Sequence, residues 1–376
     1  MDSGLRRDDD GETPSGGVQT RSLVSSILVG ETPATQNEAI VQTRKFGNNG
    51  PQVSVIGQGT WYLDRGDRKA AVAALKRGID AGMTHIDTAE MYGDAELVIA
   101  DAIGGRRDEL FLVSKVLPSN ASRRGAITAC ERSLKRLKTD RLDCYLLHWR
   151  GTYPLAETVA AFDELIAAGK IRSWGVSNFD ADDLDELLEV AGEGNIACNQ
   201  VLYHLRERAI EHAVIPWCEQ HGVAVVAYSP FGHNDFPSAS SKAGVVLQSI
   251  AQVRKATPRQ VALSFLTRLP SVLAIPKASN VDHAAENAAA GTLKLSGDEL
   301  AALDALPDDR KSLHDLRAAL ESGALETPKP GDARLADGTE VTLLTEHMEG
   351  MEGVKAIIAS STDETVYMVD YETDGM

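Results

Sequence analysis

The sequence predicts an α/β protein built as a (β/α)8 TIM barrel, and three observations support this prediction. Short apolar runs with strand character alternate with longer amphipathic segments. Eight such pairs fill roughly 250 residues, the size typical of this barrel. Residues with reactive side chains end the strands all round the set. Open doubly wound sheets alternate in the same way, but no Gly-x-Gly-x-x-Gly follows the first strand, so we expect the closed barrel.

The first element expected is an N-terminal β-hairpin that precedes the barrel strands. Its sequence is Phe46-Gly-Asn-Asn-Gly-Pro-Gln-Val-Ser, in which Asn49-Gly50 is a dipeptide typical of hairpin turns. We expect these two residues to supply the positive φ angles that such a turn requires.

The barrel strands are expected where short apolar runs are bounded by turn residues: Val55–Gly59, His85–Thr88, Leu110–Lys115, Leu142–His148, Ile171–Asn178, Ala197–Tyr203, Ala224–Pro230 and Val272–Pro276. The clearest helices between them have apolar residues at helical spacing: Lys69–Ala81, Arg123–Leu137, Leu155–Ala168, Ala181–Ala191, Ile210–His221 and Pro258–Leu269. Gly82 and Gly169 are expected to stop two of these helices, and Thr257-Pro258 to cap and start a third.

The two ends of the chain differ in composition from the barrel region. Residues 1–40 are rich in polar turn formers, which predicts a disordered extension before a barrel over residues 41–316. A linker is expected over residues 317–331, which include Pro328-Lys-Pro-Gly. Residues 332–376 are expected to form a small, partial β module with three short strands: Glu340–Leu344, Val354–Ala359 and Thr365–Tyr371.

The formal net charge of −17 lies mostly outside the barrel region, which holds 35 acidic and 31 basic residues. Binding to a nucleic-acid backbone needs clustered Lys and Arg, so we expect no nucleic-acid partner. No apolar run approaches the ~20 residues of a membrane span, so we expect no membrane partner. A barrel with nearly balanced charge can still bind an anionic ligand.

The cysteine pattern indicates a reducing compartment. Cys130, Cys144, Cys198 and Cys218 are scattered without Cys-x-x-Cys spacing, so free buried thiols are expected in place of a disulfide or metal framework. The N-terminal residues lack the apolar core of a signal peptide, and we therefore expect a cytoplasmic protein.

Three ionisable residues end apolar runs that point into the predicted barrel mouth. Asp87, Lys115 and His148 would each be costly there without a partner, so we expect them to pair with one another. A Lys–Asp pair beside Tyr92 would lower the pKa of its phenol and make it a general acid near neutral pH. The alternative is a structural ion pair beside a surface aromatic residue, but that alternative leaves His148 unexplained.

These motifs together resemble the aldo-keto reductase family over about residues 41–316. The matching segments stand in the family's order: Ile86-Asp-Thr-Ala-Glu-Met-Tyr-Gly, Val113-Ser-Lys, Tyr145-Leu-Leu-His-Trp, Gly169-Lys-Ile-Arg-Ser-Trp-Gly-Val-Ser-Asn, Asn199-Gln, Ile275-Pro-Lys and Glu286-Asn. Asn199-Gln-Val-Leu-Tyr-His, Pro216-Trp-Cys and Lys311-Ser-Leu-His are most similar to bacterial and archaeal members of the methylglyoxal reductase type.

The resemblance implies roles for the residues at the strand ends. Tyr92 would donate a proton to the substrate carbonyl, Lys115 and Asp87 would tune it, and His148 would orient the carbonyl. The cofactor-binding residues that the resemblance implies are Thr60, Trp61, Asp87, Ser177, Asn178, Gln200, Tyr228, Ser229, Pro230, Phe231, Lys277, Ala278, Ser279, His283, Glu286 and Asn287. A structural role remains open for Gln200, as backbone partner, and for Tyr228, as packing.

The resemblance also implies NADPH as cofactor, with NADH as the weaker choice. Lys277 and Ser279 would meet the adenosine 2′-phosphate. Two residues depart from the family pattern: Ala278 stands where serine is common, and His283 where arginine is common. Because arginine binds phosphate through a rigid fork and histidine does so weakly, we expect weaker discrimination between the two cofactors.

The substrate is expected to be a small or aromatic carbonyl compound. Trp61, Tyr92, His148 and Trp149 are the substrate-binding candidates, with Phe231 and Tyr153 as further aromatic residues near the mouth; packing roles remain equally open for the aromatic residues. Alternatives are reduction of sugar-derived ketones or alcohol oxidation, and, from another class, a nucleotide-sensing regulatory subunit. We expect a monomer or a weak homo-oligomer.

The C-terminal tail resembles a YdhK-like domain of unknown function that is truncated at Met376. His347, Met348 and Met351 are soft-metal-capable side chains in a short segment. Three ligands from one loop without cysteine make a thin site, so a turn with methionine packing is favoured and no metal is expected.

Overall fold

The computed structural model describes residues 41–233, 236–308, 340–342, 355–361 and 367–371. Its largest sheet has eight parallel strands in which sequence neighbours are also hydrogen-bonded neighbours. The strands are β3 (Gln58–Gly59), β4 (His85–Asp87), β5 (Phe111–Val116), β6 (Leu142–Leu147), β7 (Ile171–Ser177), β8 (Ile196–Leu202), β9 (Ala224–Tyr228) and β10 (Val272–Ala274). Each lies within or beside one of the eight predicted runs.

The sheet closes on itself between its first and last strands. The Gly57 N–H donates to the Ala274 carbonyl at 2.8 Å, and the Ala274 N–H donates to the Val55 carbonyl at 3.0 Å. A further parallel bridge joins Gly59 to Lys277. An open doubly wound sheet leaves its edges unpaired, so the predicted (β/α)8 barrel is confirmed.

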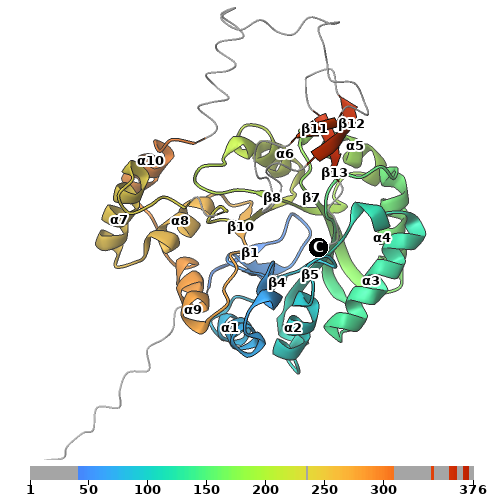
Figure 1. The fold of residues 1–376 in the computed structure, drawn as a ribbon, viewed down its shortest axis with the longest axis horizontal. Helices are drawn as coiled ribbons and strands as arrows, with labels where there is room; N and C mark the ends of the chain where they lie inside the picture. Colours follow the sequence, from blue (N-terminus) through green and yellow to red (C-terminus); the bar gives the residue numbers. More distant parts are fainter. Residues whose placement is uncertain (1–40, 234–235, 309–339, 343–354, 362–366, 372–376) are drawn as a thin grey trace, which may run out of the picture. The chain divides into compact units, whose positions relative to one another are not determined.

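Helices follow the strands and surround the sheet, as Figure 1 shows in a view along the barrel. They are α1 (Arg68–Asp80), α2 (Ala95–Ala102), α3 (Arg123–Leu137), α4 (Leu155–Ala167), α5 (Ala181–Ala191), α6 (Val214–His221), α7 (Lys242–Arg254), α8 (Pro258–Leu266), α9 (Val281–Ala290) and α10 (Gly297–Asp304). The predicted bounds of α3 and α5 are confirmed to the residue. Helix α6 starts four residues later than predicted because Ala209–Glu211 form a separate 3-10 turn.

Local sequence signals account for the helix ends. Thr257 and Gln260 form a capping box at the start of α8, each side chain accepting from the other residue's backbone N–H. Gly82 and Gly169, with φ of 93° and 69°, follow the ends of α1 and α4, as predicted.

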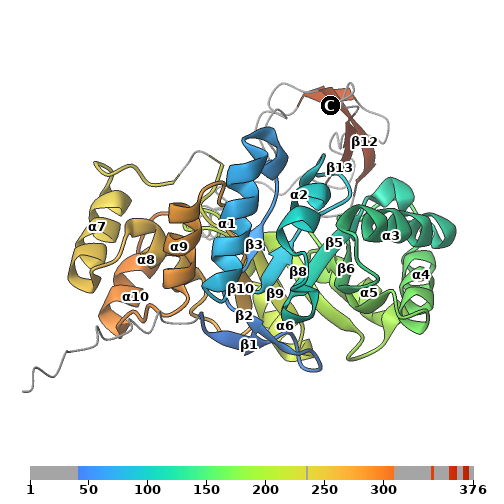
Figure 2. The ribbon, with the colours of Figure 1, turned by 90° about the horizontal axis from the view of Figure 1, so that it is seen from below.

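The N-terminal hairpin lies at one end of the barrel strands (Figure 2). Its strands β1 (Thr43–Lys45) and β2 (Gln52–Ser54) pair antiparallel. The prediction for its turn is wrong, because neither Asn49 nor Gly50 has a positive φ and Gly47 does, at 67°. Contact with the barrel decides this conformation: a Cβ on Gly47 would lie 2.9 Å from the carbonyl oxygens of Ala197 and Gly222.

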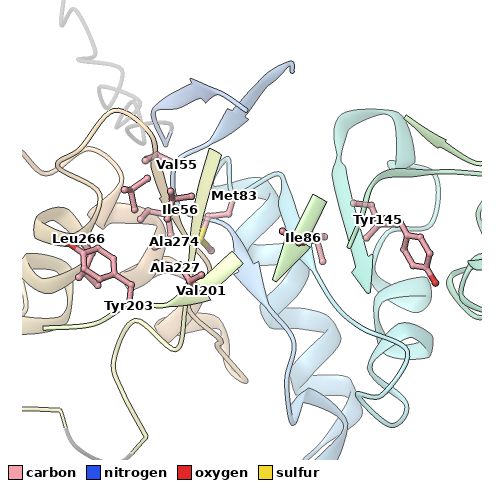
Figure 3. Packing of buried hydrophobic residues seen from close by; sticks show 14 of the residues in the cluster. Val55, Ile56, Met83, Ile86, Tyr145, Val201, Tyr203, Ala227, Leu266 and Ala274 are labelled. Atoms are coloured by element: carbon pink, nitrogen blue, oxygen red, sulfur yellow. The ribbon is translucent and has the colours of Figure 1, made fainter. Parts of the chain in front are cut away.

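Two apolar clusters stabilise the barrel. The larger one fills the space between strands and helices, and Figure 3 shows part of it, with Ile86, Tyr145 and Val201 from the strands. The smaller one includes Phe46 of the hairpin together with Phe111 and Cys198 from the strands. We infer that this second cluster fills the barrel interior at the hairpin end.

The described part of the C-terminal tail consists of three antiparallel strands, which overlap the three predicted β runs: β11 (Glu340–Thr342), β12 (Lys355–Ser361) and β13 (Tyr367–Tyr371). The predicted disorder of residues 1–40, the linker over 317–331 and the segment from His347 to Met351 lie outside the described residues. The prediction for the cysteines is confirmed, since all four are buried free thiols. Across the described ranges, no helix is both long and apolar enough to cross a membrane.

Candidate active site

A cavity of about 380 Å³ opens at the carboxyl ends of the strands. Ten residues predicted from the sequence line it: Thr60, Trp61, Asp87, Tyr92, Gln200, Tyr228, Ser229, Pro230, Phe231 and Lys277. They come from loops and strand ends on both sides of the barrel closure, so the fold brings together residues that are far apart in the chain. The volume falls within the range of small-molecule and cofactor sites.

A buried ion pair lies at the base of the cavity. Lys115 of β5 donates from Nζ to Oδ1 of Asp87 on β4 at 2.5 Å, and both side chains are almost fully buried. Gln200 Nε2 donates to the other carboxylate oxygen of Asp87 at 2.7 Å. Lys115 Nζ also donates to the Thr88 carbonyl at 2.9 Å, so both charged groups have several partners.

Tyr92 lies directly against this pair. Lys115 Nζ is 3.4 Å from the Tyr92 hydroxyl oxygen and can donate to it. Burial raises the pKa of Tyr92 above its ordinary value, although the positive charge of Lys115 acts in the opposite direction. The predicted lowering of the Tyr92 pKa is therefore wrong, because desolvation of the phenolate outweighs the ammonium group. Tyr92 consequently keeps its proton at neutral pH.

Lys115 itself remains an ammonium group. Burial alone lowers the pKa of Lys115, but the Asp87 carboxylate and the Tyr92 hydroxyl more than offset this and raise it above its ordinary value. The predicted pairing of Asp87 with Lys115 is confirmed, since both lie at the ends of adjacent parallel strands.

His148 does not join the ion pair, contrary to the prediction that all three groups pair. Its ring lies edge-on to Tyr92, with ring centres 5.7 Å apart. Burial, and then the Lys115 charge, hold the pKa of His148 well below its ordinary value, so the imidazole is neutral. Its Nδ1 is buried without a hydrogen-bond partner among the described residues.

A second set of polar side chains follows β7 and β9. Asn178 adopts φ of 60° and donates from Nδ2 to the His148 carbonyl at 3.1 Å. The Tyr228 hydroxyl donates to Oδ1 of Asn178 at 2.8 Å, and the Ser177 hydroxyl donates to the Gln200 carbonyl at 2.7 Å. Ser229 also has a positive φ of 45°, a conformation that non-glycine residues adopt mainly where the surroundings enforce it.

Residues after β10 form a cluster at the start of α9. Lys277 Nζ donates to Ser279 Oγ at 2.9 Å, and it has no carboxylate partner among the described residues. His283 lies exposed in the first turn of α9, next to the capping residue Asn280. Glu286 accepts from the Thr257 hydroxyl at 2.5 Å, and Asn287 is buried. Ala278, Ser279, His283, Glu286 and Asn287 do not line the main cavity.

The predicted aromatic substrate residues fall in different places. Trp61 lines the cavity and lies 6.4 Å from the Tyr92 ring, centre to centre. Trp149 stacks at a tilt on His148, with ring centres 4.8 Å apart, and lies outside the cavity lining. Tyr153 is 38% exposed and also lies outside the lining.

Five lining residues were not predicted from the sequence: Gly59, Tyr62, Gly232, His233 and Ile275. Tyr62 stacks on Trp61 and has a positive φ of 58°. His233 lies edge-on to Trp61, with Nε2 buried and without a hydrogen-bond partner among the described residues. Gly59 and Ile275 fall within predicted strand runs, and Tyr62, Gly232 and His233 lie in loops just beyond predicted site residues.

The donor set of this cavity fits an anionic nucleotide. Lys277 has no carboxylate partner in the described part of the chain, and burial lowers its pKa. A bound anion would therefore stabilise the charged form of the Lys277 side chain. Tyr228 presents an aromatic ring at the cavity wall, and Gln200 presents an amide. A planar ring with a carboxamide and a phosphate-bearing tail matches this arrangement of groups.

Comparison with known proteins agrees with this geometry. Residues 55–308 match the model of the Aldo/keto reductase family. The chain belongs to the aldo/keto reductase family. It is therefore an oxidoreductase by family, as the motifs imply.

Alignments with individual family members extend over most of the barrel sequence. Methylglyoxal reductase YeaE of Escherichia coli K12 is 49% identical over 253 residues, which are 66% of this chain and 89% of that protein. Glyoxal reductase of Bacillus subtilis is 33% identical over 267 residues, 70% of this chain and 92% of that protein. An aldo-keto reductase from Klebsiella pneumoniae, solved in complex with NADPH, is 48% identical with a TM-score of 0.68, covering 73% of this chain and 98% of that one.

The tail matches a different family model. Residues 337–376 match a protein of unknown function, DUF1541. The tail therefore has a relationship of its own, separate from the aldo/keto reductase match. The resemblance to YdhK-like domains stays a prediction.

Proposed function

We propose that this chain reduces small aldehydes and ketones to alcohols with NADPH, and that Tyr92 donates the proton. The observation that supports this most strongly is the position of Tyr92, which lines the cavity and lies 3.4 Å from the buried ammonium group of Lys115. The NADPH complex of the Klebsiella pneumoniae relative supports the choice of cofactor.

Tyr92 acts as the general acid in this proposal. When bound, the nicotinamide supplies a hydride to the carbonyl carbon, and the carbonyl oxygen must then gain a proton. The raised pKa of Tyr92 keeps the phenol protonated and ready to donate at neutral pH. As the proton leaves, the Lys115 ammonium group stabilises the phenolate that forms, because it is already within donating distance.

Asp87 and His148 have different roles in the proposed reaction. Asp87 holds Lys115 in place and keeps it charged, so it acts on the substrate only through Lys115 and is a positioning residue. His148 is neutral and edge-on to Tyr92, which suits a hydrogen-bond donor that orients the carbonyl oxygen without competing as an acid.

The remaining predicted residues would hold the cofactor. Tyr228 would cover one face of the nicotinamide, and Ser177, Asn178 and Gln200 would meet its carboxamide. Of these four, Tyr228 and Gln200 line the cavity. Lys277 and Ser279 would meet phosphate, and Glu286 and Asn287 the adenine. The retained Lys277–Ser279 pair supports NADPH over NADH.

Methylglyoxal is the substrate that the comparisons favour, because the YeaE relative is 49% identical and bears that name. Trp61 and Tyr62 form a stacked aromatic wall that suits small or flat carbonyl compounds. We also infer a reducing compartment, which agrees with four free thiols and with the expected cytoplasmic location.

Turnover by the purified full chain tests the proposal. NADPH absorbance is followed with methylglyoxal, 4-nitrobenzaldehyde and a sugar-derived ketone, and in reverse with NADP and alcohols. We expect the two aldehydes to give the highest kcat/KM. A preference for the ketone or for oxidation would replace the proposed substrate class. NADPH binding without turnover of any carbonyl compound would favour the nucleotide-sensing alternative.

A further inference from the structure

A smaller cavity of about 200 Å³ lies beside helices α7, α8 and α9. Its walls include Phe236 of the β9–α7 loop, Thr257 and Arg259 at the start of α8, and Glu286 of α9. Two hydrogen bonds fix this arrangement: the Thr257 hydroxyl donates to Glu286 Oε1 at 2.5 Å, and Gln260 Nε2 donates to the Glu286 carbonyl at 3.0 Å.

Arg259 lies between the two cavities. Its guanidinium carbon is 5.5 Å from the ring centre of Phe231, which lines the main cavity, and 5.1 Å from that of Phe236, which lines the smaller one. The two rings pack edge-to-face at 5.8 Å. The charge of Arg259 thus faces two aromatic rings at the point where the cavities approach each other.

This arginine differs from two others of the described residues, which each pair with a carboxylate. Arg254 pairs with Glu299 at 2.6 Å, and Arg268 pairs with Glu211 at 2.9 Å. Arg259 has no carboxylate partner among the described residues, and its side chain is exposed. A cation–π contact at an exposed site is weak, so the guanidinium can leave the rings for an anion at little cost.

The neighbouring helix shows why such a cation is useful. Lys277 and Ser279 precede α9. His283, in the first turn of this helix, stands where the family resemblance implies arginine, and it has an imidazole in place of a guanidinium group. Imidazole is a poorer phosphate ligand than a guanidinium group, which donates through a planar fork. Arg259 lines the same smaller cavity as Glu286 of this helix.

We propose that Arg259 binds the adenosine 2′-phosphate of NADPH, and that it supplies the guanidinium group which His283 does not. The inference rests on the proposed function, since it assumes that the dinucleotide extends from the main cavity into the smaller one. Arg259 is then a residue that determines cofactor choice, and it leaves Phe231 and Phe236 when the phosphate arrives.

Nucleotide binding to the full chain tests this assignment without relying on activity. Affinities for NADPH and NADH are measured by quenching of tryptophan fluorescence, and those for 2′,5′-ADP and 5′-AMP by competition. Four proteins are compared: wild type, R259A, R259K and R124A. Arg124 is the matched control, because it is likewise an exposed arginine at the second position of a helix, α3, and lines neither cavity.

We expect R259A to weaken the binding of NADPH and 2′,5′-ADP by about 10- to 100-fold, the range of a lost charge-assisted hydrogen bond. NADH and 5′-AMP should change by less than about twofold, and R259K should fall between, since lysine keeps the charge without the fork. R124A should match wild type for all four nucleotides. Higher salt should weaken NADPH binding more in wild type than in R259A.

Two results would overturn the inference. If R259A weakens the binding of NADPH and NADH equally, Arg259 acts on the adenine or on the β9–α7 loop and not on the 2′-phosphate. If NADPH binding is unchanged, Arg259 does not contact the cofactor. The proposed function fails separately, if wild type binds neither dinucleotide. Melting curves of R259A and R259K check that each variant is folded.

Discussion

The two ends of the barrel are built from the same strands but differ in the environment of their buried ionisable groups. His85 and Asp87 lie two residues apart on β4 and so face the same interior. At the hairpin end, the His85 ring packs edge-on against Phe46 and Phe111, with ring centres 5.9 and 5.6 Å apart. At the open end, Asp87 meets Lys115 at 2.5 Å and Gln200 at 2.7 Å.

Burial is nearly complete at both positions, yet the charge states differ. Burial lowers the pKa of His85 to about 4, and neither ring nitrogen has a hydrogen-bond partner in the described part of the chain. The histidine is therefore neutral and packs with Phe46 and Phe111 into an apolar plug at the hairpin end of the barrel. Asp87 and Lys115 are buried as a hydrogen-bonded pair. Burial alone does not make a catalytic group; a counter-charge and donors that support the ionised form are also needed.

Removing the counter-charge should have the largest effect. Lys115→Met leaves the Asp87 carboxylate buried with Gln200 as its remaining side-chain partner, so we expect the free energy of unfolding to fall by about 3–5 kcal/mol. Carbonyl reduction should fall at least about 100-fold, because Tyr92 loses the group that stabilises its phenolate. Urea unfolding and NADPH turnover measure the two effects.

The matched control for that variant is Lys170→Met. Lys170 pairs with Glu131 on the surface, where both side chains are partly exposed, and such a pair contributes at most about 1 kcal/mol. Equal losses of stability in the two variants would contradict the distinction between the buried and exposed pairs.

Truncating one phenylalanine at each end should separate stability from activity. Phe46→Ala leaves a hole in the plug and should lower the free energy of unfolding by about 3–5 kcal/mol, with kcat/KM of the folded protein within about threefold of wild type. Phe231→Ala, at the half-buried cavity wall, should instead raise the KM for NADPH and cost about 1 kcal/mol or less of stability. Thermal melts and steady-state kinetics below the melting range compare the two; loss of activity in folded Phe46→Ala would contradict a purely structural plug.

Acid should destabilise the plug through His85. Its folded pKa of about 4 lies below the ordinary value of about 6.5, so stability present above pH 6.5 is lost as the pH falls toward 4, by about 3 kcal/mol. His85→Leu removes this titration, and its free energy of unfolding should fall less between pH 7 and pH 4. Parallel losses in wild type and variant, measured by urea unfolding at each pH, would show that His85 is not the responsible group.

The smallest expected effect concerns a single hydroxyl group. Tyr228→Phe keeps the aromatic ring but removes the donor to Asn178 Oδ1, so the KM for NADPH should rise about fivefold, equivalent to about 1 kcal/mol. Tyr145→Phe is the control, because the Tyr145 hydroxyl is buried without a partner among the described residues. That control should leave kinetics unchanged; a matching rise in KM for both variants would contradict a local role for the Tyr228 hydroxyl.

Much of the fold follows from local signals in the sequence. The bounds of α3 and α5 follow from apolar spacing and caps, and the Asp87–Lys115 pair follows from the ends of adjacent parallel strands. The hairpin turn could not be predicted in the same way. Contacts with Ala197 and Gly222, about 150 or more residues away in the chain, decide which glycine has the positive φ.

The charge states in the site depend on the balance between burial and nearby charges, and the sequence does not reveal this balance. The sign of the Tyr92 pKa shift results from desolvation set against the Lys115 charge, and its outcome depends on how fully the ring is buried. His148 was expected in the ion pair, yet its ring packs edge-on against Tyr92. His233 lies in a loop without periodic pattern, so its position against Trp61 depends on the path of that loop.

Comparing Tyr92→Phe with wild type tests whether Tyr92 donates the proton. The measurement is kcat/KM for methylglyoxal reduction, made together with the dissociation constant for NADPH. We expect kcat/KM to fall at least about 100-fold, the range for loss of a general acid, while NADPH binding stays within about twofold of wild type. A Tyr92→Phe protein that binds NADPH normally and turns over within about threefold of wild type would contradict this role for Tyr92.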